Sequence, residues 1–193
     1  REINEELRLR GRGTKSELII PLPGETKKSF MKGVDDLLNS NTGSLTIYTL
    51  MMLHGTEFQD PEFRKRFGYK GKYRIVPLNF GEYNNKRIFD YEEAGISTND
   101  MPFEDYVYLR SIALMVESLI NGRPFDEFFQ YAKILGLSKA NFLKRLRDNI
   151  AKAPREINKL FNEFISDTKS ELWNSEKELL NYYRRDENFQ LLK

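Results

Sequence analysis

Residues 17–26, with the sequence ELIIPLPGET, determine how the first part of the chain folds. The run from Glu17 to Ile20 is short and apolar. Pro21 and Pro23 end it, because proline has no amide hydrogen to donate to a continuing central strand. Thr26 then suits the N-cap position of a helix. The stretch therefore predicts a strand that turns directly into a helix.

The next residues predict that helix and a second strand. Apolar side chains recur at helical spacing on one face, at Phe30, Met31, Val34, Leu37 and Leu38. Residues 39–43 are a stop-and-turn signal, and residues 45–53 have the composition of a strand that is apolar on both faces. Since this connection is too long for a hairpin, we expect two parallel strands joined by a right-handed crossover.

Two strings in this region resemble the late barrel strands of radical S-adenosylmethionine (SAM) enzymes. They are ELIIPLPGETKKSF at 17–30 and LTIYTLMMLHGTEF at 45–58, where the family pattern is roughly ELI-x-GLPGET, a further strand and PGTE. Residues 72–83 and 102–106 are similar to the region that follows the barrel in members with an amino-terminal cobalamin-binding domain. The chain departs from the pattern at Pro21, where the family has Gly, and at His54, where it has Pro.

The resemblance implies an α/β chain that begins with a partial TIM-like barrel, consisting of the last parallel strands and their crossover helix. We expect this part at 1–60, an irregular or β-hairpin cap at 61–101 and a helical region at 102–193. The cap is predicted from strand-like runs at 73–77 and 87–92 around a turn-rich segment, 79–86. Residues 1–10 read as a further helix.

Helical periodicity begins at Pro102. We expect a first helix to end at Asn121-Gly122, a second to span 125–135, a third to run from Ser138 to about Ala151, and a fourth to begin at Pro154. The last stretch, 176–193, is charged and less periodic, so we expect it to fray or to dock on something else.

By resemblance, the carboxyl ends of the two strands would contact SAM. The implied residues are Ile20, Pro21 and Leu22 beside the adenine, and Tyr48, Leu50 and Met52 against its ring. The alternative is that these side chains belong to an ordinary core, where most apolar strand residues are found. The ring of Pro21 also fills the space that Gly leaves for a close approach.

His54 is the single histidine of the sequence and the candidate catalytic residue. It is expected at the mouth of the barrel, and histidine is the residue type most often used for proton transfer near neutral pH. A role in proton transfer or substrate binding competes with a hydrogen bond that stabilises the loop, in which Glu57 is the nearest carboxylate. A lone histidine without cysteines is a poor metal site, so we expect no metal ligands here.

The sequence contains no cysteine. Radical SAM chemistry requires a 4Fe-4S cluster held by the thiolates of a CxxxCxxC loop, so this chain alone cannot hold that cluster or act as the enzyme. The chain also begins at Arg1 without a methionine. We therefore expect a carboxy-terminal part of a larger enzyme, whose cysteine loop and cobalamin domain are absent from this chain. That parent would generate a 5′-deoxyadenosyl radical to modify an organic, small-molecule or lipid-like substrate. Its cofactors would be SAM and the cluster, with cobalamin left open.

Two other functions remain open. The helices predict a non-catalytic protein-interaction module, and the basic and aromatic residues at 64–74 fit the RNA-binding part of an RNA-modifying enzyme. Acidic residues follow at 82–93, and the formal net charge is only +2, so no nucleic-acid partner is expected.

The missing barrel strands predict the partners of this chain, and the absence of a membrane-spanning run predicts its location. The first expected partner is the missing amino-terminal half of the same protein. An unpaired strand edge at 17–22 predicts a homo-oligomer when this part is isolated. The sequence has no apolar run of the roughly 20 residues that span a membrane and no signal peptide, and we expect a cytoplasmic protein.

Overall fold

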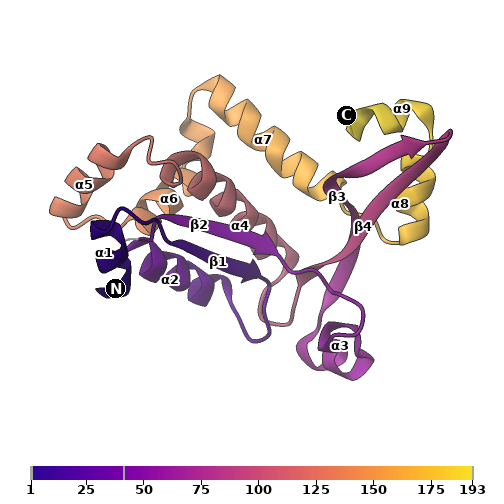
Figure 1. The fold of residues 1–193 in the computed structure, drawn as a ribbon, viewed down its shortest axis with the longest axis horizontal. Coiled ribbons are helices and arrows are strands. Elements are labelled where there is room, and N and C mark those ends of the chain that lie inside the picture. Colours follow the sequence, from indigo (N-terminus) through magenta and orange to yellow (C-terminus); the bar gives the residue numbers. More distant parts are fainter. Residues whose placement is uncertain (1, 41, 193) are drawn as a thin grey trace.

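The computed structural model describes residues 2–40 and 42–192, which form mixed α/β structure with two two-stranded sheets (Figure 1). The strands are β1 (Lys15–Ile20), β2 (Ser44–Thr49), β3 (Lys70–Tyr83) and β4 (Lys86–Ser97). The helices are α1 (Glu2–Leu9), α2 (Lys27–Leu38), α3 (Pro61–Phe67), α4 (Phe103–Met115), α5 (Asp126–Ile134), α6 (Lys139–Asp148), α7 (Arg155–Ser170), α8 (Glu176–Tyr183) and α9 (Asp186–Phe189). The described residues contain no closed barrel.

The predicted strand, helix and parallel strand are confirmed. β1 pairs with β2 in parallel, with Lys15 opposite Ser44. Thr26 caps α2 through a reciprocal pair of bonds: the Ser29 amide donates to its hydroxyl over 3.1 Å, and its own amide donates to Ser29 Oγ over 2.9 Å. This cap fixes the point at which the chain enters the crossover helix.

The predicted end of the second strand was wrong. β2 stops at Thr49 rather than at Leu53, because β1 ends before Pro21 and leaves nothing further to pair with. The chain turns to β4 instead, where Met51 bridges Ala94 in antiparallel orientation. The Leu50 carbonyl accepts from the Gly95 amide over 2.9 Å, so the two sheets are joined at this point.

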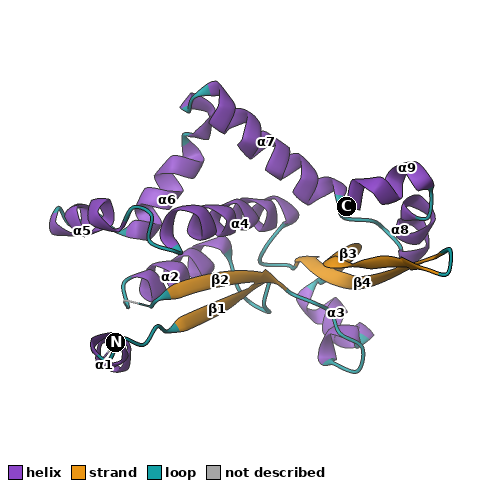
Figure 2. Ribbon diagram, turned by 45° about the horizontal axis from the view of Figure 1, so that its top comes forward, coloured by secondary structure: helices purple, strands orange, loops and turns teal. Residues whose placement is uncertain are grey.

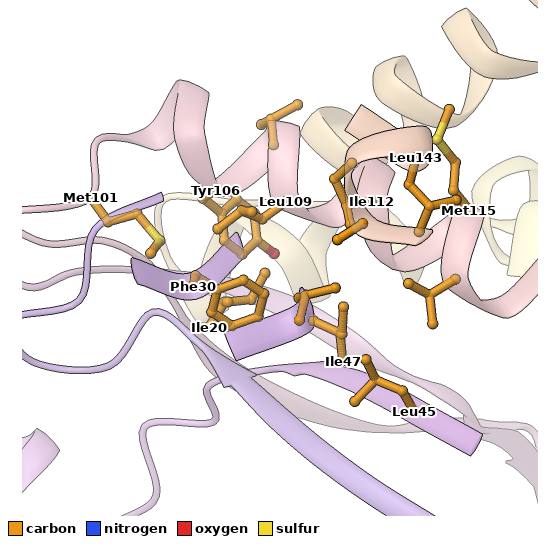
Figure 3. Packing of buried hydrophobic residues seen from close by; sticks show 14 of the residues in the cluster. Ile20, Phe30, Leu45, Ile47, Met101, Tyr106, Leu109, Ile112, Met115 and Leu143 are labelled. Atoms are coloured by element: carbon orange, nitrogen blue, oxygen red, sulfur yellow. The ribbon is translucent and has the colours of Figure 1, made fainter. Parts of the chain in front are cut away.

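The main core lies on one face of the parallel sheet. Figure 2 shows α2 and α4 on the same side of β1 and β2, and Figure 3 shows the side chains between them. Ile20, Phe30 and Leu109 are among the fully buried residues of this cluster. The buried Tyr106 hydroxyl meets the Thr49 hydroxyl at 3.2 Å, which satisfies both polar groups inside the core.

The hairpin is confirmed but is longer than predicted. Its strands extend to Tyr83 and from Lys86, and the turn is Asn84-Asn85 alone, with φ of 49° and 59°. Asparagine tolerates this left-handed backbone better than most residues, so the pair suits a tight two-residue turn. An irregular register between Ile75 and Phe80 accommodates the proline within the first strand.

The last residues dock on the hairpin instead of fraying. The Phe189 ring lies 5.9 Å from that of Phe80 and 5.8 Å from that of Phe89. Arg87 donates to the Arg184 carbonyl over 2.6 Å. Of the two predicted outcomes for 176–193, docking is therefore confirmed for 176–192, while Lys193 lies outside the described residues.

The helical region follows its predicted starts. Pro102, Ser138 and Pro154 occupy N-cap positions of α4, α6 and α7. α4 continues into a wide π-type turn, Val116–Ile120, and the Asn121 side chain then bonds both the amide and the carbonyl of Leu45. The third helix ends at Asp148, before the predicted Ala151, and short 3-10 turns follow at Ile150–Lys152, as they do at Glu57–Gln59 and Gln190–Leu192.

We predict that Leu109→Ala lowers the free energy of unfolding by about 2–5 kcal/mol, because it opens a cavity in the core beneath the sheet. The matched control is Leu160→Ala on α7, where the leucine is 58% exposed. Its effect should stay within about 0.5 kcal/mol. Urea denaturation measures both, and equal losses would show that α4 is not central to the fold.

Candidate functional site

The outer face of the parallel sheet is the candidate site. Side chains alternate along a strand, so Ile19 and its neighbour Tyr48 point away from α2 and α4. They are 40% and 43% exposed. At one end, Lys15 Nζ lies 3.0 Å from Glu17 Oε1 and 3.5 Å from the Tyr48 hydroxyl. The face is thus apolar near the carboxyl ends of the two strands and charged toward the start of β1.

β1 also has a free edge among the described strands. Its only strand partner there is β2, and the carbonyls of Thr14 and Ile20 accept from Ser44 and Leu50 on that side. In a parallel pair the peptide groups of the intervening residues point the opposite way. The peptide groups of Lys15, Glu17 and Ile19 are therefore available to a further strand.

The structure separates the six residues that the resemblance assigned to SAM. Ile20 is fully buried against the helices, Pro21 is buried, and Leu22 is half-buried. Leu50 and Met52 pack in a second cluster around Tyr69. Tyr48 alone among them is exposed on the outer face. Sequence analysis missed Ile19, although the alternation of strand side chains was a signal that could have identified it.

A clamp on the hairpin holds the loop that follows β2. Glu93 receives two bonds from Arg64, of 2.9 and 2.6 Å, and a third of 3.1 Å from Gln59. The Met52 amide donates to the Glu93 carbonyl over 2.8 Å. The position of this loop therefore depends on one carboxylate from a distant strand, which sequence analysis did not identify.

Tyr69 ties the loop after β1 to the same cluster. Its hydroxyl donates to the Pro21 carbonyl over 3.1 Å, and burial raises the pKa of Tyr69 well above its ordinary value. The phenol stays protonated and keeps this donor throughout the physiological range. Contacts with α3 and the hairpin thus fix the loops that follow β1 and β2.

His54 lies on an exposed turn beyond these fixed ends. Gly55 has a φ of 82°, and Thr56 Oγ1 donates to the Leu53 carbonyl over 2.6 Å. Within residues 2–40 and 42–192 the histidine side chain has no hydrogen-bond or ion-pair partner. The turn is closed by Thr56, and His54 remains available at the end of the sheet; Glu57 is exposed nearby.

The basic and aromatic residues at 64–74 are partly committed to the fold. Arg74 pairs with Glu92 at 2.6 Å and with Glu171 at 3.1 Å, and it is largely buried. Arg64 is occupied by Glu93, and Tyr69 is buried. The RNA-binding alternative therefore loses two of its cations and one of its rings.

No group of three or more histidine, cysteine, aspartate or glutamate side chains in the described part of the chain is arranged to hold a metal ion. Nor does any described helix combine the length and the apolar character needed to cross a bilayer.

No protein-family model matches the chain, and no curated protein matches it.

We predict that Glu93→Gln destabilises the protein by about 2–3 kcal/mol, because the half-buried Arg64 loses its charged partner. Asp36→Asn, in the exposed pair with Lys32, is the control and should cost at most about 0.5 kcal/mol. Chemical denaturation gives both values. Hydrogen exchange at the Met52 amide should also quicken in Glu93→Gln alone, and unchanged protection there would argue against the clamp.

Proposed function

We propose that this chain forms part of a radical SAM enzyme and supplies two of its late parallel strands and a helical cap. The observation that carries the proposal is a parallel strand pair with helices on one face, an open face and a free edge on β1. Helices surround the outside of a barrel, and its interior is lined by the opposite strand faces. In such a barrel Ile19 and Tyr48 would line the interior, and a further strand would pair with β1.

The residues of this chain do not fit an iron–sulfur cluster, because the sequence has no thiolate to bind one. The proposal therefore places the cluster ligands on another polypeptide segment. When bound, the cluster and SAM supply the radical chemistry.

This chain would contribute binding, orientation and exclusion of water. Tyr48 and Ile19 would offer an apolar surface to a flat ring, and the Glu93 clamp would hold the loop that carries His54. We keep His54 as the residue that faces substrate. We assign no residue to cobalamin.

A second function is proposed on a separate observation. Along α5, Phe128, Tyr131 and Ile134 are 46%, 61% and 81% exposed, a concentration of apolar surface that suits a protein interface. The two proposals are separated by the coding sequence upstream of Arg1. A CxxxCxxC loop there supports the enzyme, and a complete upstream sequence without one leaves the interaction module.

The chain alone should carry no stoichiometric cluster after anaerobic reconstitution with iron and sulfide, and it should not cleave SAM under reducing conditions. Iron analysis and visible absorbance measure the first outcome, and chromatography of 5′-deoxyadenosine measures the second. A stoichiometric cluster would show that ligands other than cysteine suffice and would require a different assignment of its site.

In an enzyme that contains this chain together with the cluster-binding segment, Tyr48→Ala should weaken SAM binding roughly 10- to 150-fold, since it removes apolar contact worth about 1.5–3 kcal/mol. Tyr83→Ala is the matched control, because Tyr83 is 66% exposed at the hairpin turn. Equilibrium binding gives both dissociation constants. Equal values for the two variants would remove the outer face from the SAM site.

A further inference from the structure

A cleft of about 400 Å³ opens at the other end of the parallel sheet, where the chain enters β2. Its walls are the carboxyl end of α2, residues 42–43, and the segment from Ile120 to the start of α6. The polar and charged residues that could contact a ligand in the cleft are Asn39, Arg123, Asp126, Gln130, Lys133 and Lys139. This cleft shares none of the residues of the open sheet face described above.

The charges in the cleft are unbalanced. Arg123, Lys133 and Lys139 contribute three cations, and Asp126 contributes one carboxylate. None of the three cations forms an ion pair with another residue of the described chain. The arginines of α3 and the hairpin are different, since Arg64, Arg74 and Arg87 each contact a carboxylate.

Lys139 is the most constrained of the three. It is half-buried, and its Nζ lies 5.6 Å from the centroid of the Phe129 ring. Desolvation lowers the pKa of Lys139, and the charges of Arg123 and Lys133 lower it further, while Asp126 acts in the opposite direction. A partly desolvated lysine with two further cations beside it is stabilised when an anion joins them.

We propose that this cleft binds the phosphate group of a small phosphorylated molecule. A phosphate dianion offsets the excess charge, and Arg123 can donate two parallel bonds to it. The three cations come from separate elements: the turn after α4, the end of α5 and the start of α6. They can therefore surround a compact anion from several sides.

The helix dipoles at the cleft do not determine whether the ligand is an anion or a cation. α6 begins at Lys139 and favours an anion through its exposed amides, whereas α2 ends at the cleft and disfavours one. The charges of the side chains therefore determine that the cleft favours an anion. Asp126, Gln130 and Asn39 offer polar partners to the hydroxyl groups of the same ligand. The volume falls in the range of small-molecule sites, and a bounded cleft favours a small ligand over an extended nucleic acid.

The test is calorimetric titration of the 193-residue protein at low ionic strength with ribose 5-phosphate, and with ribose as the uncharged probe. Ribose 5-phosphate should bind at least about tenfold more tightly than ribose, because the charged contacts are made by the phosphate. Lys139→Gln and Lys133→Gln should each weaken the binding of ribose 5-phosphate roughly tenfold. The control, Lys144→Gln, lies on the exposed side of α6 and should bind like the original protein, since Lys144 pairs with Asp148 at 2.7 Å.

Folding is separated from binding by thermal unfolding without ligand. Lys139→Gln removes a repelled charge, so its melting temperature should equal or exceed that of the original protein. Equal affinities for ribose and ribose 5-phosphate, or full binding by Lys139→Gln, would overturn the proposal. A single-stranded RNA of 12 nucleotides that binds more tightly than ribose 5-phosphate and depends on Lys139 would reassign the cleft to nucleic acid. These outcomes do not depend on SAM or on an iron–sulfur cluster.

Discussion

Leu50 connects the two halves of the structure through its backbone. Its amide donates to the Ile20 carbonyl over 2.7 Å, and its carbonyl accepts from the Gly95 amide over 2.9 Å. The first bond is the last link of the parallel pair, and the second begins the contact with the hairpin. The approach is close enough that a Cβ on Gly95 would lie 3.1 Å from the Leu50 side chain. Glycine at position 95 thus allows Leu50 to bond both sheets. The loop after β2, the Glu93 clamp and the hairpin take their positions from this contact.

Sequence predicted the elements whose causes are local. The spacing of apolar side chains located α2 and α4, and Thr26 capped α2 as expected because its partner Ser29 is three residues away. The end of β2 and the length of the hairpin depend on pairing between Met51 and Ala94, which are far apart in the chain. Local patterns hold no information on that pairing, so these boundaries were misplaced. Asn84-Asn85 was a readable turn signal, yet the Pro and Gly residues before it suggested a longer turn.

The candidate site shows the same division. Alternation along β1 and β2 was sufficient to separate Ile19 and Tyr48 from Ile20. The resemblance instead grouped Tyr48 with Leu50 and Met52, which lie beyond the end of β2 and pack around Tyr69. The Glu93 clamp could not be predicted, because it combines α3, the loop after β2 and β4. Nor could composition show the uneven distribution of charge. The net charge of +2 belongs to the whole chain and does not distinguish the paired Arg64 and Arg74 from the unpaired cations near α6.

The two ends of the parallel sheet thus differ in surface chemistry, because different elements pack beside each end. At the carboxyl ends of the strands the hairpin supplies carboxylates, which neutralise Arg64 and Arg74 and leave an apolar outer face beside a fixed loop. At the amino ends, the turn after α4 and the start of α6 bring Arg123 and Lys139 together with a single carboxylate. Covering an apolar surface lowers the free energy, and so does binding an anion beside a partly desolvated lysine and two further cations. The same small sheet therefore separates two surfaces whose preferred ligands are chemically opposite.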